Sequence, residues 1–247
     1  MDRMIYIAMS GAKQAMEQQA SVAHNMANVA TTGFRAQINN FRAVPVVGAE
    51  AATRAFVVAS TPGADLRTGP ISETGRALDV AIKGDGWLAV QMPDGSEAYT
   101  RVGNLQVGAD GQLLTMDTHP VVGEAGPLVV PPGSAVMISK DGLVTARGAG
   151  DPVTGAAEVG RLKLVNPAAT SMVRGDDGLF RMQPGVAAPP ADPSVMLMTG
   201  ALEGSNVNPV EAMVDMIANA RRFEMQMKAL QSADTNAQSA NKLLGMN

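Results

Sequence analysis

The chain has 247 residues and a formal net charge of −4, with two histidines and no cysteine. This length is enough for one or two substantial cores. The slightly acidic balance gives no general attraction to nucleic acids or anionic membranes, and the lack of cysteine excludes thiol catalysis and disulfides. Apolar residues make up 46% of the chain and aromatic residues only 3%, so Met, Ala, Val and Gly supply most of the apolar surface.

The N-terminal segment does not have the pattern of a secretory signal. Asp2 is acidic, and Lys13, Glu17 and His24 interrupt residues 4–30. No run in this segment is apolar enough for a signal peptide or a bilayer span. We therefore expect no direct membrane insertion, and export, if it occurs, by a route without a cleaved signal.

Residues 3–30 predict a first amphipathic helix, because apolar residues recur there at intervals of three and four. The recurring residues are Ile5, Met9, Ala12, Met16, Gln19, Ala23, Met26 and Ala30. Ala and Met specify a packing partner only weakly, so we expect the final packing of this helix to depend on several neighbours. An ordinary helix of a bundle is the alternative interpretation.

The end of this helix predicts a packed junction. Residues 31–33 should stop the helix, and Gly33 suits the left-handed conformation of a C-cap. Asn25 and Asn28 lie three residues apart on one helix face, where their amides can bond to backbone groups. Phe34 follows as an apolar anchor.

The middle of the chain predicts a β-rich domain, because short apolar or alternating runs are separated by turn residues. The expected strands are Val80–Ile82, Trp87–Val90, Leu113–Thr115, Pro120–Gly123, Leu128–Val130, Ala135–Ile138, Leu143–Thr145 and Leu162–Val165, with shorter ones at 56–59 and 195–198. Five Asp-Gly pairs, at Asp85, Asp94, Asp110, Asp141 and Asp177, supply the positive φ that tight hairpin turns require.

Residues 205–247 predict a second, long helix. Asn208 is a suitable N-cap, Pro209 suits the first helical position, and Glu211 completes a capping box. No proline or interior glycine follows until Gly245, so the helix would span about 54 Å.

The apolar residues of this second helix follow a heptad pattern, which is typical of a coiled coil. One row holds Met216, Phe223 and Leu230, and a companion row holds Met213, Ala220 and Met227. A helix packed on its own domain's core is the alternative interpretation. We favour a partner helix, because the N-terminal segment has the same kind of pattern.

The sequence predicts no catalytic, cofactor or metal site. The two histidines, His24 and His119, have no clear catalytic partner. The Asp-Gly loops lack the donor spacing of a calcium loop, and the glycine-rich stretch 84–86 lacks the lysine of a phosphate-binding loop.

Several motifs together resemble the bacterial flagellar basal-body rod and hook proteins. The N-terminal motif is N-M-A-N-V-A-T-T-G-F-R from Asn25, and the C-terminal motif begins as L-E-G-S-N-V at Leu202. Central motifs are G-D-G-W from Gly84, Y-T-R-V-G from Tyr99 and D-G-Q-L from Asp110. The resemblance covers nearly the whole chain. Trp87 and Leu105 depart from it, since Phe and another aromatic residue are usual there.

The resemblance implies a non-enzymatic structural subunit of the flagellar rod, which surrounds the export channel and transmits torque across the periplasm. It implies other rod proteins, copies of the chain and the flagellar type III export apparatus as partners. Within the family, Ile5-Tyr6 and residues 221–227 are most similar to members of the proximal rod, with the distal rod as the alternative. Outside the family, the alternative is a soluble β-domain binding module that forms a closed homo-oligomer.

We therefore expect an α+β protein with three parts. Residues 1–35 and 205–247 form a discontinuous helical coiled-coil domain. Residues 36–76 form an extended connecting segment with short strands, and residues 77–204 form the β-rich domain with its return loop. The helices should order fully when neighbouring subunits complete their core. The expected assembly residues are Ile5, Met9, Ala12, Met16 and Met26 against Met213, Met216, Ala220, Phe223, Met227 and Leu230, with Asn25, Asn28, Gly33 and Phe34 at the junction.

Overall fold

The computed structural model describes residues 2–45, 55–59, 63–148 and 155–244. They form two compact units, each assembled from separate stretches of the chain. The first unit holds both terminal helices with residues 37–64, and the second holds residues 28–36 and 65–206. The predicted α+β class is confirmed, because the two terminal helices pack together and the middle of the chain forms β-sheets.

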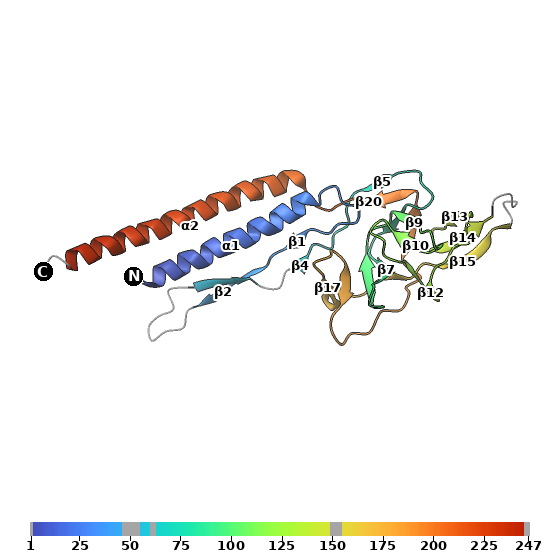
Figure 1. The fold of residues 1–247 in the computed structure, drawn as a ribbon, viewed down its shortest axis with the longest axis horizontal. Coiled ribbons are helices and arrows are strands. Elements are labelled where there is room, and N and C mark those ends of the chain that lie inside the picture. Colours follow the sequence, from blue (N-terminus) through green and yellow to red (C-terminus); the bar gives the residue numbers. More distant parts are fainter. Residues whose placement is uncertain (1, 46–54, 60–62, 149–154, 245–247) are drawn as a thin grey trace. The chain divides into compact units, whose positions relative to one another are not determined.

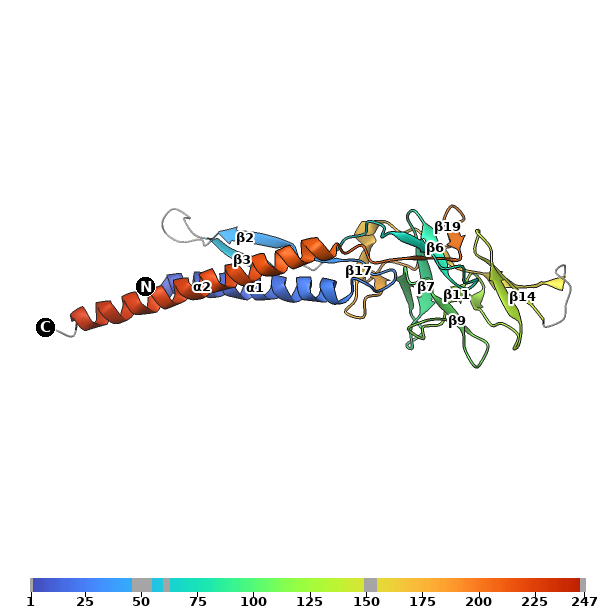
Figure 2. The same ribbon diagram turned by 90° about the horizontal axis from the view of Figure 1, so that it is seen from above.

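In the first unit, the two helices lie side by side and run antiparallel (Figures 1 and 2). Helix α1 spans Asp2–Ala27 and helix α2 spans Pro209–Leu244. Both α2 and strand β3 pack against α1. The strands of this unit form two antiparallel pairs, β1 (Gln37–Ile38) with β4 (Gly63–Ala64) and β2 (Phe41–Pro45) with β3 (Ala55–Ala59).

Helix α2 begins where its capping residues predict. The side-chain oxygen of Asn208 accepts hydrogen bonds from the N–H groups of Val210 at 3.0 Å and Glu211 at 3.4 Å. These bonds satisfy backbone donors that have no partner inside the helix.

The end predicted for α1 was about one turn too late. The helix ends at Ala27, so Ala30 lies outside it. Gly33 does adopt the positive φ expected of it, 67°. Its N–H, however, donates to the backbone oxygen of Glu203 at 2.8 Å rather than capping the helix. Tertiary contacts therefore fix the conformation of Gly33.

The second unit is built from short antiparallel strands joined by tight turns. Its largest sheet has the strand order β16-β7-β8-β18-β17, and a three-stranded sheet has the order β13-β14-β15. The remaining strands pair as β5–β20, β6–β19, β9–β10 and β11–β12. The bounds are β5 Ile71–Glu73, β6 Val80–Lys83, β7 Trp87–Gln91, β8 Glu97–Thr100, β9 Leu105–Val107, β10 Leu113–Thr115, β11 Val122–Gly123, β12 Gly126–Pro127, β13 Ala135–Ile138, β14 Leu143–Arg147, β15 Ala157–Arg161, β16 Leu164–Val165, β17 Met172–Arg174, β18 Phe180–Met182, β19 Met196–Thr199 and β20 Ala201–Glu203, with a 3-10 turn at Ala169–Ser171.

The core of this unit is mainly aliphatic. Side chains from β6, β7, β9, β10, β13, β14 and β16 are buried in one cluster, which includes Leu88, Leu105 and Leu113. Trp87 packs on Phe180 with ring centroids 4.4 Å apart. Aliphatic packing explains how a domain with so few aromatic residues still closes a core.

The predicted strands at β6, β7, β10, β13 and β14 are confirmed. The strand expected at 128–130 was wrong: Val129 makes an isolated bridge with Gln112, while Leu128 and Val130 fill the core. The apolar run reflects burial rather than a strand ladder. The glycines of all five Asp-Gly pairs have positive φ, as predicted.

Candidate assembly interface and buried junction

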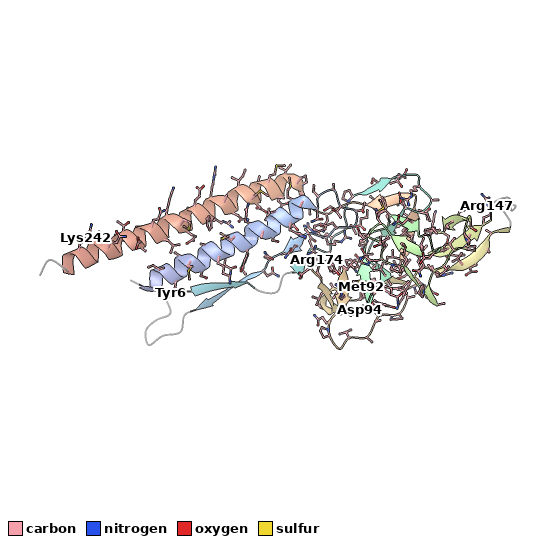
Figure 3. All side chains as sticks on the ribbon, viewed as in Figure 1. Tyr6, Met92, Asp94, Arg147, Arg174 and Lys242 are labelled. Atoms are coloured by element: carbon pink, nitrogen blue, oxygen red, sulfur yellow. The ribbon has the colours of Figure 1, made fainter. Side chains whose placement is uncertain are left out.

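The predicted row on α1 divides into a covered and an exposed part. Ala12 is buried, and Ile5 and Met26 are half-buried. Met9 and Met16 lie seven residues apart and are both exposed. Tyr6 is exposed as well, near the start of the helix (Figure 3). Helix α1 therefore presents apolar side chains that the rest of the described chain covers only in part.

Helix α2 shows the same division. Met216, Phe223 and Leu230 are half-buried, whereas the companion row of Met213, Ala220 and Met227 is exposed. The less exposed companion row begins one residue earlier and consists of Ala212, Asn219, Gln226 and Ala233. For packing within one chain, the companion row was thus predicted one residue too late. The apolar pattern marked an exposed face, and the covered row includes two amides that it did not detect.

Small residues let the two helices approach closely. Ala8, Ala12 and Ala15 are buried on α1. A Cβ atom added at Gly11 would lie 2.9 Å from the side-chain Cδ of Gln226, so Gly11 faces α2 at that level. Such close approach buries little apolar area per turn, because few large side chains lie between the helices.

Asn25 ties α1 to strand β1. Its Nδ2 donates to the backbone oxygen of Gln37 at 2.9 Å, and its Oδ1 accepts from the backbone N–H of Gln37 at 2.8 Å. The amide therefore satisfies both backbone groups of one strand residue. The expected bonding of Asn25 to backbone is confirmed. Asn28, in contrast, accepts a hydrogen bond from the Thr31 hydroxyl at 3.1 Å.

Gly33 and Phe34 lie in the second unit, packed against its β structure. A Cβ atom added at Gly33 would lie 2.4 Å from the carbonyl carbon of Arg101, so only glycine fits. Phe34 is buried, and the guanidinium carbon of Arg174 lies 5.2 Å from the centroid of its ring. Arg174 belongs to β17 and is marked in Figure 3.

The centre of this junction is a buried group of three charges. The Arg35 Nη2 atom lies 2.7 Å from Glu203 Oε1, and Arg101 Nη1 lies 3.0 Å from Glu203 Oε2. All three side chains are almost completely buried. One carboxylate thus faces two guanidinium groups. Burial lowers the pKa of Arg101, and the neighbouring Glu203 carboxylate opposes that shift.

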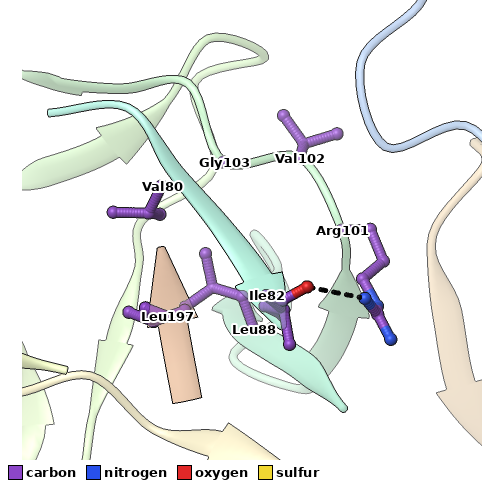
Figure 4. Close-up of a pocket in the computed structure, with 7 residues that line it drawn as sticks. All are labelled: Val80, Ile82, Leu88, Arg101, Val102, Gly103 and Leu197. Carbon is purple, nitrogen blue, oxygen red and sulfur yellow. Dashed lines mark hydrogen bonds between the residues drawn. The ribbon is translucent and has the colours of Figure 1, made fainter. Parts of the chain in front are cut away.

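Other groups stabilise the two buried guanidinium groups. The guanidinium carbons of Arg101 and Arg35 lie 5.4 Å and 6.0 Å from the centroid of the Trp87 ring, whose electron-rich face attracts cations. Arg101 Nη2 donates to Gly84 O at 2.7 Å, and Nη1 lies 3.5 Å from Ile82 O beside a small apolar cavity (Figure 4).

Asn206 completes the junction by joining three stretches of chain. Its Oδ1 accepts from the Ala36 N–H at 2.7 Å, and its Nδ2 donates to the carbonyl oxygens of Asp65 at 2.8 Å and Arg67 at 2.9 Å. Its backbone N–H donates to Phe34 O at 3.3 Å. We call Gly33–Ala36, Arg101, Glu203 and Asn206 the clamp. Their contacts fix the two chain segments at residues 33–36 and 203–206 to the β structure.

Sequence patterns alone do not reveal the clamp as a unit. Its four polar residues lie within the motifs of the family resemblance: Arg35, Arg101, Glu203 and Asn206. No local pattern indicates that a carboxylate near one end of the chain meets an arginine near the other. A signal was nevertheless present, since Arg35 and Glu203 each stand beside apolar or small residues.

The described residues hold no group of three or more acidic, histidine or cysteine side chains arranged to bind a metal. Among the same residues, neither helix combines the length and apolarity needed to cross a membrane. The prominent features are packing surfaces and a structural charge cluster. Paired terminal helices with exposed apolar rows, together with a β-rich unit from the middle of the chain, are features of a structural subunit.

Two family models match the chain. Residues 198–243 match the flagellar basal body rod FlgEFG protein C-terminal model, and residues 81–146 match the D1 domain of the flagellar hook proteins FlgE, FlgF and FlgG. The chain is 56% identical to the flagellar basal-body rod protein FlgF of Salmonella typhimurium and 55% identical to that of Escherichia coli K12, in each case over the full length of both chains. It is 32% identical to the rod protein FlgG of Agrobacterium fabrum, over 98% of this chain and 99% of the other.

The chain belongs to the FlgEFG family of flagellar rod and hook proteins and is a structural subunit of the flagellar basal-body rod. It is not an enzyme. The full-length matches favour this role over a closed homo-oligomeric binding module.

Proposed function

We propose that the exposed apolar rows of α1 and α2 are the surfaces through which this subunit joins other rod proteins and copies of itself. The observation that carries the proposal is the exposure of Met9 and Met16 on one helix and of Met213 and Met227 on the other. Large apolar side chains at regular helical spacing indicate a surface that another helix covers.

The exposed apolar surface of α2 extends beyond its companion row. Val210, Val214 and Ile217 are also exposed in its first turns. Because Val210, Met213, Val214 and Ile217 are three or four residues apart, they form one broad exposed face of α2, and Met9 and Met16 of α1 form a second, unlike surface. Contacts of this kind between unlike surfaces need not close into a ring, and repeated along an axis they build a helical tube. This geometry supports the tubular rod that family membership implies.

Family membership also supports a finer placement. The higher identity to FlgF than to FlgG favours the proximal part of the rod. In this proposal, the subunit passes through the flagellar type III export apparatus. It then forms part of the periplasm-spanning tube that surrounds the export channel and transmits torque.

Ordering of the helices during assembly is part of the proposal. Among the described side chains of α2, Ala212 and Asn219 are buried, and the others are half-buried or exposed. So little burial compensates poorly for the conformational entropy lost by a long helix. Neighbouring subunits would supply the missing contacts.

The double substitution Met213→Glu with Met227→Glu tests the interface. Both side chains are exposed, so the subunit should fold normally, while two carboxylates on the proposed surface should block assembly. We expect a strain that carries only this variant to be non-motile. Motility is measured in soft agar, and folding of the purified variant by circular dichroism.

Ala229→Glu with Asn236→Glu is the matched control. These exposed residues lie seven apart in the row of the charged residues Asp215 and Arg222, away from the exposed apolar side chains, and the substitutions add the same charge. This control should swim normally. Full motility of the methionine variant would contradict the proposed interface.

A further inference from the structure

The proposed assembly surface has an unusual chemistry for an interface between helices. Four of its exposed side chains are thioethers: Met9 is 54% exposed, Met16 60%, Met213 47% and Met227 39%. The two members of each pair are seven or fourteen residues apart, so each pair lies along one side of its helix. Before assembly, solvent and small oxidants reach all four side chains.

Methionine is the only sulfur-containing residue of this protein, since the chain has no cysteine. The single tryptophan, Trp87, is buried. An oxidant of the peroxide class therefore meets exposed methionine before it reaches the buried Trp87. In the reaction, a sulfur lone pair attacks one peroxide oxygen, an S–O bond forms and the O–O bond breaks. Methionine becomes the sulfoxide, and the peroxide is reduced to one molecule of water.

The sulfoxide has opposite consequences in the two states of the subunit. In the free subunit, water hydrates the new oxygen, so the fold is unaffected. In an assembled rod, the same oxygen would be buried between apolar side chains without a donor, which disfavours association. Oxidation at these positions thus acts on assembly and leaves the folding of one chain intact.

We propose that Met9, Met16, Met213 and Met227 form an oxidation-sensitive switch on the assembly surface. Conversion of these residues to sulfoxides keeps the subunit out of the rod, and incorporation into the rod protects the same residues. This inference rests on the proposed function, because it requires these rows to be the interface. Thiol-dependent sulfoxide reductases would return an oxidised subunit to the assembling pool.

The test compares three forms of the full-length protein before and after hydrogen peroxide. They are the wild type, a quadruple Met→Leu variant of the four switch residues, and a control with Met116→Leu and Met137→Leu. The two control residues are 59% and 60% exposed and lie in the β-rich unit, outside the proposed surface. Peptide mass spectrometry locates the sulfoxides, and sedimentation in a mixture with other rod subunits measures assembly.

We expect peroxide to reduce assembly of the wild type and of the control by on the order of tenfold or more. The quadruple leucine variant should assemble equally well with and without peroxide. Treating oxidised wild type with sulfoxide reductases should restore its assembly, and this arm does not depend on how the variants fold. Normal assembly of wild type that carries all four sulfoxides would overturn the switch, as would equal inhibition of the quadruple variant.

The failure of the switch and the failure of the interface give different results. If untreated Met213→Glu with Met227→Glu assembles normally, the interface itself is wrong. If that variant fails to assemble while fully oxidised wild type assembles, the interface stands and only the switch is wrong.

Discussion

Glu203 places one negative charge between two buried arginines. Removing that charge takes away the carboxylate that pairs with both buried guanidinium groups, and breaking a buried ion pair typically costs about 3–5 kcal/mol. Water cannot compensate, because Arg35, Arg101 and Glu203 are all shielded from solvent. The charge of Glu203 is therefore more important than its shape.

Glu203→Gln keeps the size of the side chain and removes its charge. We expect the β-rich unit of this variant to unfold at a clearly lower urea concentration than wild type. Trp87 provides the readout, since it is the only tryptophan and lies beside both arginines. Glu73→Gln on the paired strand β5 is the control, because Glu73 is exposed. Equal urea midpoints for Glu203→Gln and wild type would show that the charge cluster does not stabilise this unit.

Gly33 is required for two separable reasons, its positive φ and its contact with Arg101. Gly33→Ala would be destabilised by both effects, whereas Gly75→Ala would be destabilised only by its positive φ. Gly75 has a φ of 72° and open space where the Cβ would be, while Gly33 has a φ of 67° and a backbone atom 2.4 Å away. The left-handed conformation alone costs an alanine about 1–2 kcal/mol.

Gly33→Ala should therefore lose more stability than Gly75→Ala in the same urea experiment. The difference between the two variants measures the contact with the Arg101 backbone. Equal losses would mean that the backbone of residues 33–36 shifts to admit the methyl group, and that the clamp is less rigid than its contacts indicate.

The two terminal helices differ in how their neighbours cover them. Helix α1 has α2 on one side and the β3 strand on another, and three of its alanines are buried. Gly11 lies level with Gln226, so the start of α1 lies level with about residue 235 of α2. The last two to three turns of α2 therefore extend past α1, as Figure 1 shows.

This difference predicts the order of proteolysis in the unassembled subunit. Trypsin should cut first after the exposed Arg221, Arg222 and Lys228 of α2, because poorly covered helices open locally. Arg35 and Arg101 should resist, since the clamp buries them. Mass spectrometry at short times identifies the cuts. Assembly should protect the α2 sites, and equal resistance of α2 and the β-rich unit before assembly would contradict ordering on assembly.

Elements with strong local signals were predictable from the sequence. The start of α2 is fixed by Asn208 and Pro209, and both helices follow from their apolar spacing. Strand β8 was missed because its four residues begin with Glu97 and form no apolar run. The row of α2 that faces inward was misplaced because Asn219 and Gln226 are polar, although Asn219 is buried. Periodicity identifies apolar faces, but it does not reveal which of two faces is covered by the same chain.

At the scale of the whole molecule, both units are discontinuous in sequence. The helical unit draws on both ends and on residues 37–64, and the β-rich unit includes residues 28–36 from before that stretch. The sequence predicted that the ends meet, because both terminal segments have similar apolar patterns. It did not predict that Glu203 and Asn206 hold the linker at residues 33–36, since these contacts depend on the completed fold.

The Arg35–Glu203 pair joins residues that are 168 positions apart. A chain that emerges from its N-terminus onward, from a ribosome or through a narrow channel, exposes Arg35 and Arg101 long before Glu203 follows. Until then, the β-rich unit would have to bury two positive charges beside Trp87 without their shared carboxylate. A stalled or truncated chain that lacks strand β20 cannot complete this site. The charge cluster can therefore form only after most of the polypeptide, including strand β20, is available.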